Sequence, residues 1–241
     1  MDPRRAGIAR RLGRLVVPVE CPGCGEPDVR WCEACEAPWW EAPLRCESGA
    51  PRLSALEPPL AAWSIAPLEG AVHGTVAAWK DAGRRDLAAL LGPAMGRAAA
   101  ALAPQLGVTA GAFAVVPCPA RAAHTRRRGV DIPLVLAGAA AAGLSDAGLR
   151  ALVRPVLAPG GGGARGAGDR LRWRAPAPRA TRHAWRPSHA VPALLVDDVV
   201  TTGATLVRAA EALAGTPLVP VGALVLASAQ GPTQGAHVRR G

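Results

Sequence analysis

The stretch with the clearest capacity for chemistry runs from Ala193 to Thr205, with the sequence Ala-Leu-Leu-Val-Asp-Asp-Val-Val-Thr-Thr-Gly-Ala-Thr. An apolar run of strand length precedes two adjacent carboxylates, Asp197 and Asp198, and a hydroxyl-rich turn follows them. Beyond Gly203 the apolar residues recur at helical spacing. The first N–H groups of a helix lack partners within it and lie at the positive end of its dipole. This layout therefore predicts a phosphate-binding turn.

The acidic pair narrows the class of phosphate ligand. A nucleoside triphosphate site would need a glycine-rich segment with a Lys-Ser/Thr pair, and neither stands here. Two carboxylates would repel a bare polyphosphate, yet they accept hydrogen bonds well from sugar hydroxyl groups, so we expect a sugar phosphate. All thirteen positions resemble the signature of type I phosphoribosyltransferases, which bind phosphoribosyl pyrophosphate (PRPP). The alternative is a buried strand that ends in an acidic turn.

Four cysteines near the N-terminus have the spacing of a metal site. They form two Cys-x-x-Cys pairs separated by seven residues, Cys21 with Cys24 and Cys32 with Cys35. Each pair can bring two thiolates to one ion, and four thiolates leave no open coordination position, so we predict a structural zinc site. A redox Cys-x-x-Cys and incidental cysteines are the alternatives. Cys46 could serve as a substitute ligand, although its isolated position favours a spare thiol.

A basic loop follows another apolar run. Residues 113–117 predict a short buried strand, and four arginines occur within the eight residues 121–128. Guanidinium groups pair with phosphate oxygens, and ligands in open α/β sheets lie beyond the carboxyl ends of the strands. We therefore predict a pyrophosphate loop that includes Pro117, Arg121, Arg128 and Gly129. A solvated basic loop is the alternative.

The remaining patterns predict an α/β fold with a mostly parallel sheet flanked by helices. Further strands are expected at 61–66, 151–157, 193–196 and 219–227. Helices are expected at about 72–80, 86–102 and 131–142, and after residue 203. The expected organisation is a basic N-terminus with a zinc knuckle (1–46), a linker (47–60), a main domain (61–228) with a mobile loop (159–190), and a polar tail (229–241).

The chain has 241 residues and a formal net charge of +10, carried almost entirely by arginine because Lys80 is the only lysine. A basic surface suits nucleic acid or a polyphosphate ligand. A genome rich in G+C would give the same excess of Arg, Ala, Gly and Pro. The N-terminus lacks the apolar core of a signal peptide, and we expect no membrane span and a cytoplasmic location. In that compartment cysteines favour metal binding over disulfides.

The order of these motifs resembles the ComF family of phosphoribosyltransferase-like proteins, which are associated with DNA uptake in natural transformation. The motifs are, in chain order, the four-cysteine knuckle, a Lys-x-x-Gly-Arg-Arg segment at 80–85, a Val-Pro-x-Pro loop at 116–129 and the late PRPP signature. The resemblance covers nearly the whole chain and implies a type I phosphoribosyltransferase fold behind an N-terminal zinc knuckle. It also implies PRPP with Mg²⁺ as the ligand, and single-stranded DNA or DNA-uptake proteins as partners.

The same resemblance assigns the site residues. Asp197 and Asp198 would bind the ribose hydroxyls. The segment around the 5′-phosphate would comprise Val200, Thr201, Thr202, Gly203, Ala204 and Thr205.

The sequence leaves two functions open. The first is a phosphoribosyltransferase that acts on an unidentified acceptor, and the intact signature favours it. The second is a non-catalytic, PRPP-dependent module that binds single-stranded DNA or a protein partner. It is favoured by the departure from the family pattern at Val130-Asp131-Ile132 and by the lack of an obvious general base. A purely structural zinc protein would leave the acidic pair unexplained.

Overall fold

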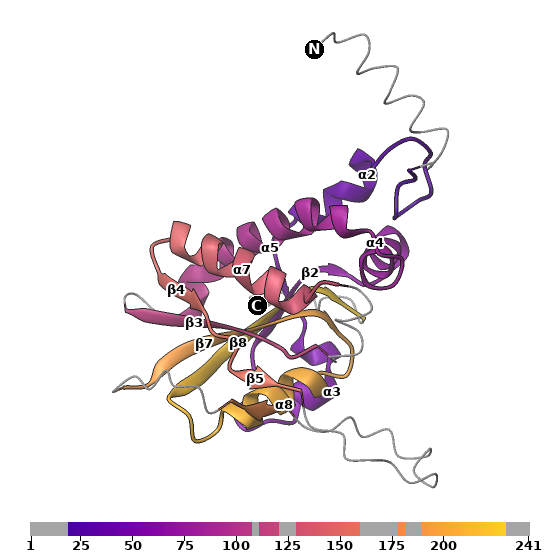
Figure 1. The fold of residues 1–241 in the computed structure, drawn as a ribbon. Helices are drawn as coiled ribbons and strands as arrows, with labels where there is room; N and C mark the ends of the chain where they lie inside the picture. Colours follow the sequence, from indigo (N-terminus) through magenta and orange to yellow (C-terminus); the bar gives the residue numbers. More distant parts are fainter. Residues whose placement is uncertain (1–18, 108–110, 121–128, 160–177, 182–188, 230–241) are drawn as a thin grey trace, which may run out of the picture.

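A computed structural model describes residues 19–107, 111–120, 129–159, 178–181 and 189–229, and these residues form an α/β fold around one large sheet (Figure 1). The strand order is β1-β2-β8-β7-β3-β4, and every neighbouring pair is parallel except β1 with β2. The strands are β1 (Leu44–Arg45), β2 (Ala62–Pro67), β3 (Ala112–Pro117), β4 (Arg150–Val153), β7 (Val191–Val200) and β8 (Leu218–Ser228). The mostly parallel sheet predicted from sequence is confirmed.

Helices cover both faces of this sheet (Figure 1). The first face carries α4 (Gly70–Lys80), η3 (Arg85–Leu87), α5 (Ala88–Leu102), η4 (Ala103–Leu106) and α7 (Ile132–Asp146). The second face carries α3 (Pro51–Ser54) and α8 (Ala204–Leu213). Near the N-terminus lie α2 (Glu33–Glu36), η1 (Ala37–Trp40) and η2 (Glu47–Gly49), and a small separate sheet pairs β5 (Leu157–Ala158) with β6 (Arg179–Ala180).

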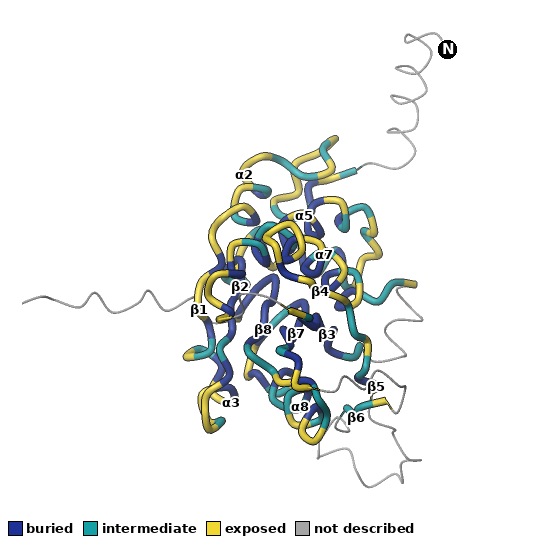
Figure 2. Tube along the Cα trace, turned by 90° about the vertical axis from the view of Figure 1, so that its left-hand side faces the viewer, coloured by how far each residue is buried: buried dark blue, intermediate teal, exposed yellow. Residues whose placement is uncertain are grey.

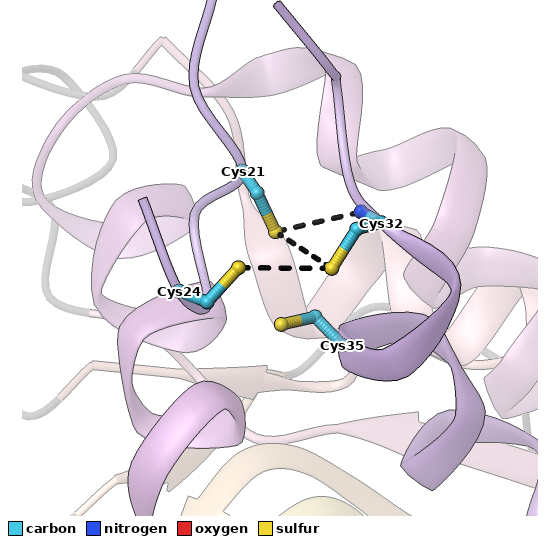
Figure 3. Close-up of side chains that lie close together, drawn as sticks. All are labelled: Cys21, Cys24, Cys32 and Cys35. Atoms are coloured by element: carbon cyan, nitrogen blue, oxygen red, sulfur yellow. Dashed lines mark hydrogen bonds between the residues drawn. The ribbon is translucent and has the colours of Figure 1, made fainter. Parts of the chain in front are cut away.

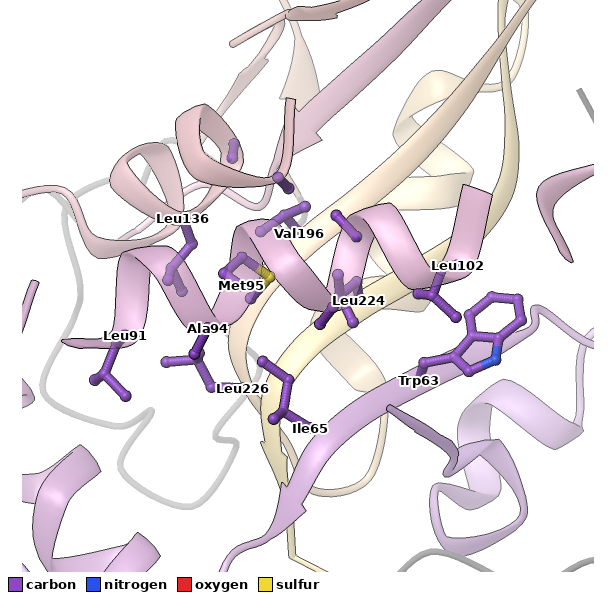
Figure 4. Close-up of a cluster of buried hydrophobic side chains, with 14 of the residues drawn as sticks. Trp63, Ile65, Leu91, Ala94, Met95, Leu102, Leu136, Val196, Leu224 and Leu226 are labelled. Atoms are coloured by element: carbon purple, nitrogen blue, oxygen red, sulfur yellow. The ribbon is translucent and has the colours of Figure 1, made fainter. Parts of the chain in front are cut away.

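The central strands are buried on both sides, which explains their unbroken apolar sequence (Figure 2). Along β7, side chains alternate between two hydrophobic clusters: Leu194 and Val196 face α5 and α7, and Leu195 faces α8. Figure 4 shows the first cluster, in which Met95 of α5 lies over β7 and β8. This packing fixes the position of the residues that follow along β7.

Small residues bring α5 and α7 into close contact. A Cβ atom added to Gly143 would overlap the backbone of Gly96, so the two helices meet almost backbone to backbone. Among the described residues, one helical segment, Arg85–Leu106, is long and apolar enough to cross a membrane, and 56% of its most apolar window is buried. A core helix has the same length and composition, so this is weak evidence for a span.

Several elements differ from the predicted boundaries. The strand predicted at 193–196 extends over Val191–Val200, so the acidic pair lies within the strand rather than after it. The strand predicted at 151–157 is two separate strands, β4 and β5, and α7 continues to Asp146 because its apolar face persists beyond residue 142. The segment predicted as a linker contains η2 and α3, and Leu53 within it is fully buried.

The connections define where a ligand crevice can form. From β3 the chain passes through α7 to β4 on one side, whereas from β7 it passes through α8 to β8 on the other. The adjacent strands β3 and β7 therefore flank a topological switch point, where the loops at their carboxyl ends diverge. The predicted pyrophosphate loop and the predicted phosphate turn follow these two strands.

Candidate functional site

The acidic pair lies buried on β7, next to the switch point. Asp197 and Asp198 are each only 8% exposed. Asp198 points toward the face that carries α4, where Lys80 Nζ contacts its two carboxylate oxygens at 3.0 and 2.9 Å. Lys80 is the last residue of α4 and lies 118 positions earlier in the chain. This ion pair was not predicted from sequence, although the presence of a single lysine could have drawn attention to it.

Asp197, unlike Asp198, has no ion-pair partner among the contacts of the described residues, and it lies near the carboxylates of Asp198 and Asp131. Burial and the neighbouring charge of Asp198 raise the pKa of Asp197 to about 8, although the N–H of Asp198, which donates to Asp197 Oδ1 at 2.9 Å, and Lys80 act against this rise. Asp131 adds to it from the start of α7, where its side chain accepts a hydrogen bond from Leu134 N. At neutral pH Asp197 is thus largely protonated. The pair then carries about one negative charge, and Lys80 offsets it.

The turn after β7 leads into a helix N-terminus beside a small cavity. Gly203 adopts a left-handed conformation (φ +78°) that lets α8 begin at Ala204. No side chain of the described residues caps this helix, so no described side chain satisfies its first N–H groups. The segment from Val199 to Leu206 lines a small cavity of about 60 Å³, and the side chains of Thr201, Thr202 and Thr205 are exposed around it.

Helix α3, which lies in the segment predicted as a linker, packs against this turn. The N–H of Arg52 in α3 donates to Thr202 O at 3.1 Å, and a Cβ atom on Gly203 would lie 2.6 Å from Leu53 Cγ. Residues 51–54 therefore hold the turn in place. A larger cavity of about 420 Å³ lies between α5 and α7, but small residues with Arg97 and Asp146 line it and it does not include the acidic pair.

Of the two described ends of the predicted pyrophosphate loop, Pro117 lies beside β7 and Gly129 lies against Arg85. Pro117 ends β3 opposite Val196, and Cys118 N donates to Val196 O at 2.8 Å. The pKa of the Cys118 thiol is raised well above its usual value because it is buried and close to the acidic pair. Gly129 has φ +68°, and a Cβ atom there would overlap the Arg85 guanidinium. Arg121 and Arg128 lie outside the described residues.

The four predicted cysteines form one cluster (Figure 3). Their sulfur atoms all lie within 4.8 Å of one another, with Cys32 Sγ 3.8 Å from Cys21 Sγ and 3.6 Å from Cys24 Sγ. A tetrahedral ion with bonds of ~2.3 Å requires sulfur separations of roughly 3.8 Å, so the cluster fits zinc. Cys46 lies apart from it in the second hydrophobic cluster, where burial raises the pKa of its thiol to about 11.

Ionisation within the cluster also favours a cation. Burial raises the pKa of Cys21, but hydrogen bonds from the backbone around Cys32, Cys24 and Gly23 outweigh it and lower the value to about 6. The pKa of Cys35 is raised by burial and by the other three thiols. Four thiolates this close repel one another, and a divalent ion would offset that repulsion.

No protein-family model matches the chain, and a search of curated proteins found no significant relative.

Of the predicted elements outside the site, the residues 1–18, 160–177, 182–188 and 230–241 lie outside the described part of the chain. These ranges hold most of the predicted mobile loop and polar tail.

Proposed function

We propose that this chain is a type I phosphoribosyltransferase-like protein of the ComF kind that binds PRPP together with Mg²⁺. The observation that carries the proposal is the buried acidic pair on β7, which leads directly into an uncapped helix N-terminus beside the switch point. The carboxylates would accept hydrogen bonds from sugar hydroxyls, and the N–H groups at the start of α8 would bind a phosphate. Only a few residues of one strand and turn separate the two sets of groups.

Each part of the ligand has a matching group on the protein. Asp198 accepts hydrogen bonds from a ribose hydroxyl, and Asp197 can donate its proton to one or accept from one. The turn at 201–205 binds the 5′-phosphate through backbone N–H groups and threonine hydroxyls. The pyrophosphate extends toward Pro117, at the carboxyl end of β3. Mg²⁺, when bound with the ligand, would supply positive charge that offsets part of the charge of the pyrophosphate.

Lys80 gives the site its charge balance. Two ionised carboxylates would repel the phosphates of PRPP, but one proton on Asp197 and the ammonium group of Lys80 leave the pair nearly neutral. The site can therefore accept sugar hydroxyls without repelling the rest of the ligand. In phosphoribosyl transfer, the bond from ribose C1 to pyrophosphate breaks as the acceptor bonds to C1. The role of these residues is to hold the ribose in place for that step.

For the cysteine cluster we propose a structural zinc ion. All six cysteines are free thiols in the structure, which fits a reducing compartment, and we propose a cytoplasmic location.

Calorimetric titration with PRPP and Mg²⁺ tests the proposal. We expect one saturable site in the wild type. Asp198 should contribute about 1.5–3 kcal/mol through a hydrogen bond to a charged group and the protonated Asp197 about 0.5–1.5 kcal/mol, so Asp197→Ala/Asp198→Ala should weaken binding by roughly 30-fold or more. Glu211→Gln, on the exposed far end of α8, is the matched control and should bind like the wild type. Wild-type protein that binds no PRPP would refute the proposal.

The alternative, a non-catalytic module that binds single-stranded DNA, is favoured by the net charge of +10. Two measurements separate it from the enzyme. Release of pyrophosphate from PRPP in the presence of nucleobases supports the transferase. Binding to an oligothymidine that weakens steeply as salt rises, without pyrophosphate release, supports the module. Absence of DNA binding at low salt excludes the module.

A further inference from the structure

The cysteine knuckle, defined as residues 20–36, lies directly against α4, the helix that carries Lys80. A Cβ atom on Gly23 would lie 2.9 Å from Ala71 Cβ in α4, and one on Gly74 would lie 2.5 Å from Pro22 O. Gly23 also lies against the cluster itself, since the same added atom would be 2.7 Å from Cys35 Sγ. The first turns of α4 therefore rest on the backbone that holds two of the cysteines.

Arg84 joins the other end of this unit to the knuckle. Its guanidinium donates to Glu20 O at 2.8 Å and to Arg30 O at 2.9 Å, and so contacts the chain just before each cysteine pair. Two further hydrogen bonds of 2.9 Å hold it to the carboxylate of Asp86. This one side chain therefore ties both arms of the knuckle to the turn that follows α4.

Lys80 lies between these two attachments. The knuckle contacts α4 at Gly74 on one side of Lys80 and reaches Arg84 on the other, and Arg84 N donates to Ala78 O across the turn. The end of α4 is thus fixed from two directions while Lys80 extends to the acidic pair.

We propose that the metal-loaded cysteine knuckle positions Lys80 against Asp198 and thereby sets the affinity of the sugar-phosphate site. The described knuckle residues contain one short helix, α2, and one isolated bridge between Glu20 and Pro27, so a metal ion held by the four cysteines would be the main cross-link of the knuckle. Loss of the ion frees the carbonyl groups that Arg84 holds. The end of α4 then loosens, and the charge of Asp198 loses its partner. The statement about affinity rests on the proposed function.

Hydrogen exchange tests the structural half without any ligand. Amides of α4 and of residues 81–87 should exchange faster in protein stripped by a zinc chelator than in zinc-loaded protein. Amides of α8, on the opposite face of the sheet, should keep their protection and serve as the control. Equal protection of α4 in the two forms would overturn the proposal, whatever the site binds.

A thermodynamic cycle tests the functional half, with PRPP and Mg²⁺ as the probe and the wild type and Lys80→Met each measured with and without zinc. Stripping should weaken binding by the wild type roughly tenfold, within the range usual for coupled sites. With zinc bound, Lys80→Met should weaken PRPP binding by a similar factor. Removing zinc from this variant should weaken binding little further, because the contact between Lys80 and Asp198 is already lost. If zinc removal weakened PRPP binding by the same factor in Lys80→Met as in the wild type, the metal would not act through Lys80.

Arg84→Lys keeps the experiment decisive if the stripped protein fails to fold. This variant retains its charge but cannot span Glu20, Arg30 and Asp86 together. It should bind one equivalent of zinc and bind PRPP several-fold more weakly than the wild type. Wild-type affinity in this variant would contradict the proposal. If the zinc-loaded wild type binds no PRPP, the proposed function fails, and the exchange measurement still decides whether the knuckle positions α4.

Discussion

Replacing Asp197 with asparagine should stabilise the protein at neutral and alkaline pH. Asp197 is buried beside Asp198, and these two causes raise its pKa from 3.8 to about 8. Between these pH values the unfolded chain loses the proton of Asp197 while the folded protein keeps it. Stability therefore falls as pH rises from about 4 to about 8 and changes no further above that range.

The size of the effect follows from the shift. pH 7 lies roughly 3 units above the pKa of Asp197 in the unfolded state. At 1.36 kcal/mol per unit, keeping the proton in the folded state therefore lowers the free energy of unfolding by at most about 4 kcal/mol. The proton belongs to the coupled acidic pair, and relaxation around it reduces the cost. We expect Asp197→Asn to raise the free energy of unfolding by at least ~1 kcal/mol at pH 7. For a chain of this size, each kcal/mol corresponds to a rise of about 2–4 °C in Tm.

Thermal unfolding from pH 5 to pH 8.5 is the assay. The asparagine carboxamide can still accept the hydrogen bond from Asp198 N, so the gain of Asp197→Asn over the wild type should grow with pH. Asp198→Asn is the matched control, since it leaves the half-buried Lys80 without its ion-pair partner and should lower Tm. A constant difference between Asp197→Asn and wild type across this range would refute the reasoning.

Three further predictions concern the elements around the site. Purified, reduced protein should contain one equivalent of zinc; Cys46→Ser should keep it and Cys35→Ser should lose it, and equal zinc in both variants would contradict the assignment of ligands. Gly203→Ala should cost more than the ~1–2 kcal/mol of a left-handed alanine, because its Cβ meets Leu53. Gly215→Ala, with the same φ and open space around it, gives the cost of the conformation alone, and denaturant unfolding compares the two. Leu53→Ala should cost about 2–5 kcal/mol in the same assay, as for a core leucine, whereas a loss near zero would show that α3 is not part of the core.

The parts of the site that sequence could predict are local. The strand, acidic pair, turn and helix start lie within one stretch of chain, and the two Cys-x-x-Cys pairs meet over a short loop. In each case the spacing of the residues almost determines their geometry. The mostly parallel sheet could also be predicted, because strands buried on both faces are apolar throughout.

The missed parts depend on contacts between distant segments. Lys80 at a helix end has no local feature that distinguishes an active role from a dipole contact, and only the tertiary fold brings it to Asp198. Residues 47–60 appear as a linker because they are rich in proline and serine, whereas burial of Leu53 under Gly203 makes them a support for the turn. Asp131 and Cys118 likewise join the site through strand order, which local sequence does not encode.

The most direct test of the central claim is a comparison of two competitors for bound PRPP, ribose 5-phosphate and 2-deoxyribose 5-phosphate. Both fit the phosphate turn, but the second lacks a hydroxyl group for the acidic pair. We predict that the wild type binds ribose 5-phosphate about tenfold more tightly, since a hydrogen bond to a charged group contributes about 1.5–3 kcal/mol. Asp197→Ala/Asp198→Ala should show no preference. Equal affinity of the wild type for the two sugars would contradict the claim that the acidic pair binds ribose.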